Sequence, residues 1–221
     1  KDLEESLHNT VRSFTSLIEM YSPQLAGHGR RVANLSRELA VLMGMSEKET
    51  DHVEMAALLH DLGKLGLPQK FILNKHEIWS PEEEELFRRH PEEGQSIVRF
   101  VKNLDHVGLL IRSHHECFDG SGYPDRLRDE MIPLGSRVIA IVDAWDKIIN
   151  LKERTHFFIN QYLRDKQVLH AEMTHDDLLR LAGLYNMRKG ASSRFDPDVV
   201  EAFLKLMEKK GLKERRQETL A

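Results

Sequence analysis

The sequence contains a single cysteine, Cys117, among 221 residues. An internal disulfide is therefore excluded, and we expect a reducing compartment, the cytoplasm. Long hydrophobic runs are also absent, because the longest apolar stretches are short and broken by charge, so we expect no membrane span. The opening residues, KDLEESLHNT, lack the apolar core of a secretory signal. Excess positive charge is missing too, because the net charge is −4, so the composition does not indicate binding to nucleic acid.

The sequence does contain the pattern of a helical protein. Apolar residues make up 40% and charged residues 31%, as in an ordinary soluble globular protein, and the length suits one domain with a sizeable core. Apolar residues recur at helical spacing almost throughout, and no segment has convincing strand character. We expect helices over 3–21, from Ser22-Pro23 to Gly44, from a Ser46–Glu49 capping box through 66, from Ser80-Pro81, over 92–104, 105–116 and 136–150, and from Thr174 and Asp196-Pro197.

The N-terminal segment has two interpretations. Its apolar and aromatic residues follow a repeat close to 3.5 residues, at Leu3, Leu7, Phe14, Leu17 and Tyr21. This pattern fits a plain amphipathic helix that packs on its own domain. It also fits a signalling helix that follows an upstream sensor or receiver domain and forms a homodimer.

Certain ionisable residues occur on segments that are otherwise apolar. A single histidine on an apolar helix face is usually a satisfied core residue, and the chain has twelve histidines. However, three buried helices that each carry an ionisable group inward need a shared cation to offset the cost of burial. The candidate metal ligands are His28, His60, Asp61, His90, His114, His115 and Asp143.

The types of ligand narrow the choice of metal. Imidazole and carboxylate without thiolate suit Fe, Mn, Ni, Co or Zn better than Mg or Ca. We expect two sites, the first from His28, His60, Asp61 and Asp143, and the second from His90, His114 and His115. Asp61 is the natural bridge, because a carboxylate can give one oxygen to each ion. Two ions ~3.5–4 Å apart can activate water and hold both the attacked and the leaving oxygen of a phosphate.

Lys64 lies one turn beyond His60. It is either a solvated lysine near a helix end or a catalytic lysine turned toward a phosphate. We favour the second interpretation, in which the ammonium stabilises charge that develops in the transition state.

A glycine-rich segment follows the His114-His115 pair. Its turn residues include Asp119, Gly122, Tyr123 and Pro124. The segment is either a tight connection or a lid over a substrate, and its position at the rim of the proposed site favours the lid.

Several strings of the sequence match one known family: HDLGKLG, ILNK, RRHPEEG, HHECFDGSGYP, IPLGSRVIAIVDAWD and FDPDVVEAF. From about His28 to Asp146, and again from Phe195, the chain closely resembles the HD-GYP domain, a subgroup of the HD phosphohydrolase superfamily. The resemblance implies an all-α, single-domain HD-type helical bundle with a short GYP lid loop. It implies a site for two or three metal ions, often iron or manganese, and hydrolysis of cyclic di-GMP to linear pGpG and, in some members, GMP. It also implies an upstream receiver or sensor domain.

On this resemblance the chain divides into three segments. We expect a linker or signalling helix over 1–22, the HD-GYP domain over 23–210 and a disordered tail over 211–221. Within the domain, 151–194 is a helical segment that diverges from the family.

The family's functional residues carry over at most positions. All seven candidate ligands match metal ligands of the family, Lys64 matches the lysine of HDxGK, and Tyr123 matches the tyrosine of GYP. Members with a third metal have glutamate four residues before the position of His28, where this chain has Gln24. A neutral amide is a poor ligand, so we expect two metals.

The chain departs from the family pattern in three places. Cys117 replaces a usual arginine, Arg126-Leu127 replaces a usual Gly-Leu, and the basic RPY motif after Asp146 is missing. Lys152, Arg154 or Arg164 are the candidates to replace that motif in contacting a dinucleotide.

We therefore predict a metal-dependent phosphodiesterase for a cyclic dinucleotide, with Asp61 and Lys64 as catalytic residues. The candidate substrate-binding residues are Asp119, Gly122, Tyr123, Pro124, Lys152 and Arg154. One alternative is a metal-containing module that binds a dinucleotide or a partner domain without turnover. Another is an HD-type nucleotidase for mononucleotides, which needs only one metal.

Overall fold

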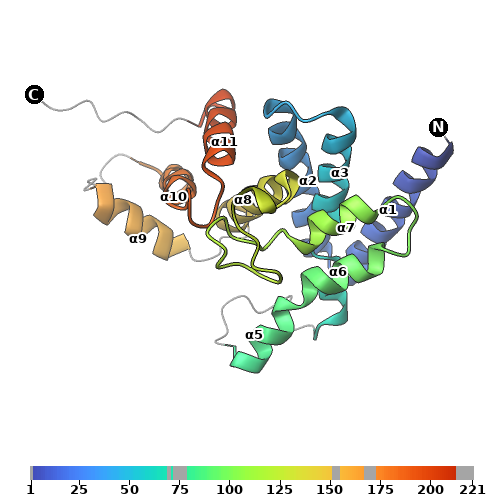
Figure 1. The fold of residues 1–221 in the computed structure, drawn as a ribbon. Coiled ribbons are helices and arrows are strands. Elements are labelled where there is room, and N and C mark those ends of the chain that lie inside the picture. The colour runs from blue at the N-terminus through green and yellow to red at the C-terminus, as the bar shows by residue number, and fades with distance from the viewer. Residues whose placement is uncertain (1, 69–70, 72–78, 151–154, 167–172, 213–221) are drawn as a thin grey trace, which may run out of the picture.

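The computed structural model describes residues 2–68, 71, 79–150, 155–166 and 173–212, and over these residues the chain forms helices and no named strand (Figure 1). The predicted all-α fold is thereby confirmed. None of the described helices is both long enough and apolar enough to cross a membrane. In chain order the helices are α1 (Asp2–Tyr21), α2 (Pro23–Leu42), α3 (Glu47–Leu59), the 3-10 helix η1 (Leu62–Gly66), α5 (Pro81–Arg88), α6 (His90–Val98), α7 (Asp105–Arg112), the 3-10 helix η2 (Asp129–Met131), α8 (Leu134–Ile149), α9 (Thr155–Lys166), α10 (His175–Lys189) and α11 (Pro197–Lys209).

Helices begin where the sequence has capping residues. The Ser22 hydroxyl accepts a hydrogen bond from the Leu25 N–H at 3.2 Å, with Pro23 at the start of α2. Ser46 and Glu49 form the predicted capping box of α3, in which the Ser46 N–H donates to Glu49 Oε2 at 2.9 Å. A cap of this kind contributes about 1 kcal/mol, so these local signals determine where the helices start.

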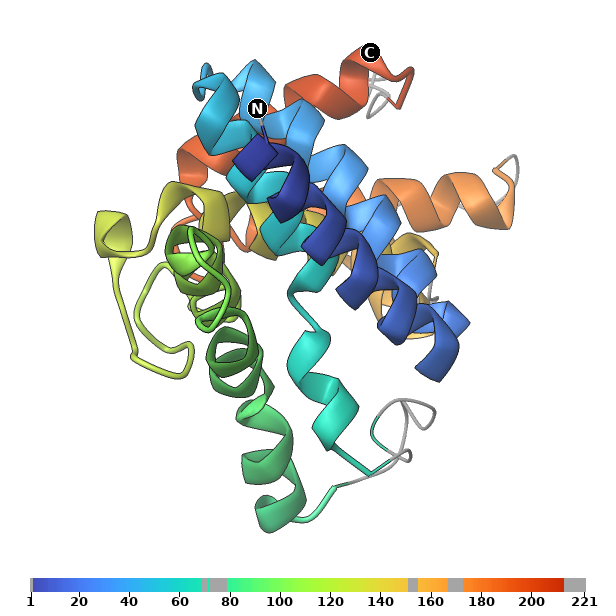
Figure 2. The same ribbon diagram turned by 90° about the vertical axis from the view of Figure 1, so that its right-hand side faces the viewer.

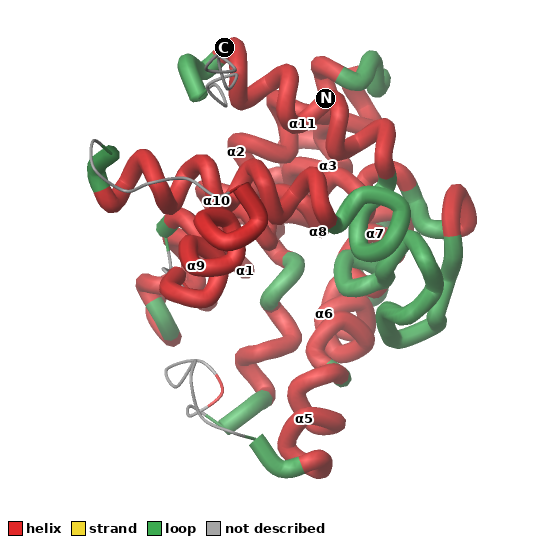
Figure 3. The backbone as a smooth tube through the Cα atoms, turned by 90° about the vertical axis from the view of Figure 1, so that its left-hand side faces the viewer, coloured by secondary structure: helices red, strands yellow, loops and turns green. Residues whose placement is uncertain are grey.

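Helix α8 lies in the middle of the bundle (Figures 1 and 3). α2 packs against α3 and α8, and α3 also packs against α7 and α8. α10 and α11 contact α8 as well, and α9 packs on α10. Apolar side chains such as Leu39, Leu59, Ile139 and Phe203 are fully buried between these helices, and their burial is the main driving force for this arrangement. As a result, α8 is in contact with α2, α3, α7, α10 and α11.

The N-terminal helix packs on its own domain, beside α2 and in contact with α3 (Figure 2). Its buried face centres on Val11 and Ile18, which are 3% and 2% exposed. Leu17 and Tyr21, which belong to the predicted apolar stripe, are 52% and 42% exposed. The helix thus buries Val11 and Ile18, whereas these two residues of the apolar repeat face solvent.

The helix expected to run through residue 66 is interrupted at His60. α3 ends at Leu59, a turn follows at His60 and Asp61, and η1 then continues as a 3-10 helix. A Cβ atom on Gly63 would lie 2.0 Å from the carbonyl oxygen of His90, so only glycine allows η1 and α6 to pack this closely. The interruption puts His60 and Asp61 at the junction of α3 and η1.

Two other predicted helices are shorter than expected. The helix over 92–104 is α6 and ends at Val98, and the helix over 105–116 is α7 and ends at Arg112. The residues after α7 form turns, so His114 and His115 lie beyond the helix and not within it.

Candidate metal centre

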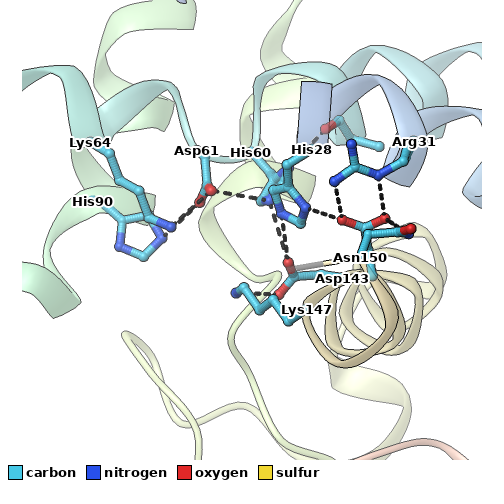
Figure 4. Close-up of polar contacts among 11 residues, drawn as sticks. His28, Arg31, His60, Asp61, Lys64, His90, Asp143, Lys147 and Asn150 are labelled. Carbon is cyan, nitrogen blue, oxygen red and sulfur yellow. Dashed lines mark hydrogen bonds and ion pairs between the residues drawn. The ribbon is translucent and has the colours of Figure 1, made fainter. Parts of the chain in front are cut away.

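The seven candidate ligands come together around one pocket. Five of them are labelled in Figure 4, which shows His28, His60, Asp61, His90 and Asp143 turned toward a common centre. They come from α2, the α3–η1 turn, the start of α6 and the middle of α8, while His114 and His115 follow α7. All are buried except His115, which is half-buried. The structure thus brings together every residue that the sequence nominated as a metal ligand.

Their ligand atoms form three overlapping groups, each with its atoms within 4.8 Å of one another. The groups are His28–His60–Asp143, His60–Asp61–His114 and His90–His114–His115. The first and the last correspond to the two sites expected from the sequence. The middle group shares His60 with the first and His114 with the last, and it also contains Asp61. A bridging role for Asp61 stays a prediction.

Three histidines of the centre are oriented by backbone carbonyl groups. Nδ1 of His60 lies 2.8 Å from the Ala57 oxygen, and Nδ1 of His90 lies 2.7 Å from the Phe87 oxygen. Nδ1 of His114 likewise lies 2.6 Å from the carbonyl oxygen of residue 111. A carbonyl oxygen only accepts, so each Nδ1 carries the proton and each Nε2 presents a lone pair to the pocket. This is the usual arrangement of a histidine that binds a metal.

Several polar atoms of the centre form no hydrogen bond within the described part of the protein, although Nε2 of His90 lies 3.6 Å from Oδ1 of Asp61. They are Nε2 of His60, His90, His114 and His115, and Oδ1 of Asp61. A buried polar atom without a hydrogen bond costs about 1–3 kcal/mol, and five such atoms facing one pocket would be an unusual burden for a core. A metal ion bound to them would remove this cost, so the residues present fit a metal.

His28 is held from both sides of its ring. Nε2 lies 3.0 Å from Asp143 Oδ1, and Nδ1 lies 2.7 Å from Asp146 Oδ2. Asp146 in turn accepts hydrogen bonds from Arg31 Nε and Nη2, both at 2.8 Å, and from Asn150 Nδ2 at 2.7 Å (Figure 4). The carboxylate of Asp146 therefore orients His28 in the way that an outer carboxylate orients a metal-binding histidine.

Sequence reasoning missed this support. Asp146 follows Asp143 by three residues on α8, and Arg31 follows His28 by three on α2, so both pairs share a helix face. That spacing was the available signal, but it does not show that the two helices face each other.

Neighbouring charges and hydrogen bonds hold the two carboxylates ionised despite their burial. Burial alone would raise the pKa of Asp61, but electrostatic interactions with His60 and with the Lys64 ammonium group hold it well below its ordinary value. Burial would likewise raise the pKa of Asp143, but the Lys147 charge and a hydrogen bond from His28 hold it well below its ordinary value. Both side chains are therefore ready to act as anionic ligands at neutral pH.

The three histidines of the second group are held neutral. Burial is the largest cause of a lowered pKa at His90, His114 and His115, and it brings the pKa of His114 to about 3. Neutral imidazole is the form that binds a metal, so protons do not compete for these nitrogens near pH 7.

Lys64 lies inside the centre. Its Nζ donates to Asp61 Oδ2 at 2.8 Å, and it lies 5.1 Å from the centroid of the Phe87 ring. The side chain is only 9% exposed, so the interpretation as a solvated lysine is wrong. A role toward a phosphate stays a prediction.

The GYP loop lies against the second group of ligands. The Tyr123 ring stacks on the His115 ring at 4.9 Å between centroids, and the Arg88 guanidinium lies 5.1 Å from the Tyr123 centroid. A Cβ atom on Gly122 would lie 2.2 Å from the Cys117 nitrogen, so the loop folds back tightly on the segment after His115. The loop therefore forms one wall of the pocket, and Pro124 follows directly after it.

Asp119 has a local role in this loop. Its carboxylate accepts the Ser121 N–H at 2.8 Å, which is the interaction of a tight turn. Glu116, which the sequence analysis did not nominate, braces the loop by accepting the N–H groups of Asp125 at 2.7 Å and Leu127 at 3.1 Å. A contact between Asp119 and a substrate stays a prediction.

Lys152 and Arg154 lie outside the described residues. Gln24 is exposed on α2, one turn before His28.

Known proteins are similar to this chain in sequence. Residues 12–156 match the family described as the HD domain. The chain is 32% identical over 207 residues to a cyclic di-GMP phosphodiesterase of Thermotoga maritima, covering 93% of this chain and 50% of that protein. It is 36% identical over 149 residues to the 3′3′-cGAMP-specific phosphodiesterase 2 of Vibrio cholerae, covering 66% of this chain and 28% of that protein. The chain thus spans half or less of the length of these relatives.

Solved structures have the same fold. A cyclic GMP-AMP specific phosphodiesterase of V. cholerae superposes with a TM-score of 0.61 at 20% identity, covering 93% of this chain and 50% of that one. An HD-GYP-type protein of Bdellovibrio bacteriovorus superposes with a TM-score of 0.58 at 21% identity, covering 84% of this chain and 53% of that one. These likenesses support the predicted HD-type helical bundle.

Proposed function

This chain belongs to the HD domain family and resembles its HD-GYP members, and we propose that it is a metal-dependent phosphodiesterase that hydrolyses cyclic di-GMP to pGpG and GMP. The observation that carries the proposal is the set of partnerless nitrogen and oxygen atoms on His60, Asp61, His90, His114 and His115, all buried around one pocket. Such a set is suited to bind metal ions, and ions of this kind serve phosphodiester hydrolysis.

The donor set supports two divalent transition-metal ions. We propose His28, His60, Asp61 and Asp143 as ligands of the first and His90, His114 and His115 as ligands of the second, with Asp61 shared. Nitrogen and oxygen donors without sulfur favour Fe or Mn, with Ni, Co or Zn as other choices. When bound, such ions polarise a phosphoryl group and lower the pKa of water toward neutrality.

The other residues of the pocket hold and shield the substrate in this proposal. Lys64 carries positive charge 2.8 Å from Asp61, where it can stabilise the negative charge that grows on a phosphate oxygen during attack. Tyr123, stacked on His115, closes one wall of the pocket and excludes water there. Gly122 permits the close fold of this wall, and Pro124 continues it.

The setting of the domain is also proposed. One relative is named a cyclic di-GMP phosphodiesterase response regulator, from Xanthomonas campestris, at 33% identity over 153 residues. We propose that α1 receives a signal from an upstream receiver or sensor domain in the cytoplasm. The exposed side chains of Leu17, Met20 and Tyr21 on α1 offer a face for a homodimer. Lys152 and Arg154 are proposed to contact the dinucleotide.

Turnover and metal content should be measured on the same protein. The protein would be purified without oxygen, its metals counted, and cyclic di-GMP and 3′3′-cGAMP offered in turn with Mn²⁺ or Fe²⁺. We expect hydrolysis with about two metals per chain, and loss of both in His60→Gln. His52→Gln is the matched control, because His52 stacks on His106 away from the candidate ligands.

The two alternatives give different results in this assay. Binding of cyclic di-GMP with no hydrolysis at full metal content would favour the module without turnover. Hydrolysis of mononucleotides by a protein with one metal, and none of cyclic dinucleotides, would favour the nucleotidase. Either result would overturn the proposal.

A further inference from the structure

Lys147 is a second cationic group at the centre. It lies on α8 one turn after Asp143, and its Nζ donates to Asp143 Oδ2 at 2.7 Å. Its side chain is 22% exposed, whereas that of Asp143 is 2% exposed. The ammonium group therefore lies at the boundary between the buried ligands and solvent. Figure 4 shows it beside Asp143, while Lys64 lies on the other side, beside Asp61.

The charge of Lys147 acts on more than its direct partner. After the effect of burial, it is the largest cause of the lowered pKa of Asp143. It also contributes to the lowered pKa of Asp61 and of His115, which belong to the other end of the centre. The positive charge of Lys147 therefore acts on several residues of the pocket, in addition to its ion-pair partner on α8.

The position of this lysine is costly for metal binding. A metal ion at Asp143 must compete with the ammonium group for the carboxylate, and it then meets a positive charge nearby. Since an ion pair four residues apart on a helix contributes only about 0.3–0.5 kcal/mol, helix stability alone is a weak reason to place a lysine here. An anion bound between the lysine and the metal site would offset the repulsion.

We propose that Lys147 is a phosphate-binding residue of this centre. It neutralises Asp143 while no metal is bound, and it turns to a phosphate oxygen of the substrate when a cation takes the carboxylate. The four-carbon side chain is flexible enough for this change, because lysine carries a point charge on several rotatable bonds. Lys64 and Lys147 then hold the anion from two sides. This inference rests on the proposed function, because it takes the ligand to be a phosphodiester.

Two affinities that move in opposite directions test the inference. Lys147→Gln, Lys147→Arg and the control Lys205→Gln would be compared, since Lys205 pairs with Glu201 on the exposed face of α11. Calorimetry would measure the affinity of the metal-free protein for Mn²⁺. It would also measure the affinities of the metal-loaded protein for inorganic phosphate and for cyclic di-GMP. We expect Lys147→Gln to bind Mn²⁺ as tightly as the parent protein or more tightly, and to bind phosphate about tenfold more weakly.

The controls separate this role from a structural one. Lys147→Arg keeps the charge and should retain most of the phosphate affinity, and Lys205→Gln should change neither affinity. A structural role would weaken both affinities together, and that result would overturn the inference, as would unchanged phosphate binding in Lys147→Gln or failure of both variants to fold. If the parent protein hydrolyses no cyclic dinucleotide, the proposed function fails, yet the phosphate and Mn²⁺ affinities still decide the role of Lys147.

Discussion

Replacement of Asp146 by asparagine tests whether the support of His28 matters. Asp146 is buried and accepts hydrogen bonds from His28, Arg31 and Asn150. Asparagine keeps the size but removes the charge and one acceptor. A hydrogen bond to a charged group contributes about 1.5–3 kcal/mol, and the Arg31 side chain is 42% exposed, so water recovers part of the loss. We expect the free energy of unfolding to fall by about 2 kcal/mol and the metal affinity to fall by about 10–100-fold.

The loss of stability should depend on pH with a definite sign. Burial would raise the pKa of Asp146, but hydrogen bonds from His28 and Arg31 outweigh it and lower the pKa from its ordinary value. A carboxyl group with a lowered native pKa stabilises the fold above its unfolded pKa, about 3.9, and loses that contribution as the pH falls through the native pKa. The stability difference between the parent protein and Asp146→Asn should therefore be constant from about pH 5 to about pH 6.5 and shrink below about pH 4. It should also decrease as the pH rises through the pKa of His28, which burial lowers but which hydrogen bonds to Asp143 and Asp146 raise above its ordinary value.

Urea unfolding in the presence of a chelator measures this difference, and competition with a metal indicator measures the metal affinity. Asp51→Asn is the matched control, because Asp51 is a partly exposed acid paired with Arg37 far from the centre, and its loss should cost less than about 1 kcal/mol. Equal metal affinity in the parent protein and Asp146→Asn would refute the idea that Asp146 orients His28.

Three further variants test other parts of the centre. Asp61→Ala should abolish hydrolysis and lower the number of bound metals, because it removes the shared carboxylate; full activity would contradict the bridge. Lys64→Ala should lower kcat about 10²–10³-fold and leave the metal content unchanged, which parallel kinetics and metal analysis would check. Gly63→Ala should lower the free energy of unfolding by about 3 kcal/mol, since its Cβ atom would lie 2.0 Å from the His90 carbonyl oxygen. A thermal shift no larger than that of Gly66→Ala, which meets no atom within 4 Å, would contradict the last expectation.

The candidate metal ligands could be predicted because the sequence pattern itself indicates that they are buried. His28, His60 and Asp143 each interrupt an apolar helix face, and periodicity alone shows that such a face turns inward. The capping box of Ser46 and Glu49 is equally local, and it lies where the sequence predicts it. Features carried by a few neighbouring residues are therefore the ones that sequence reasoning recovers.

The features that were missed depend on contacts between distant segments. The interruption of the helix at His60 goes with the close packing of η1 on α6. The spacing of apolar residues along one segment cannot reveal this contact with another segment. The link from Asp146 to His28 spans α8 and α2, and the ion pair of Lys147 becomes meaningful only once Asp143 is known to face the pocket. The burial of Val11 and Ile18 on α1 likewise depends on contacts with the distant helices α2 and α3.

The most direct measurement is anomalous X-ray diffraction at the metal edge from crystals of protein purified without oxygen. The account predicts two peaks ~3.5–4 Å apart, one beside His28 and Asp143, the other beside His90 and His115, with Asp61 between them. A pocket that binds no metal in metal-replete protein, or a single peak that leaves His90, His114 and His115 without a ligand, would contradict it.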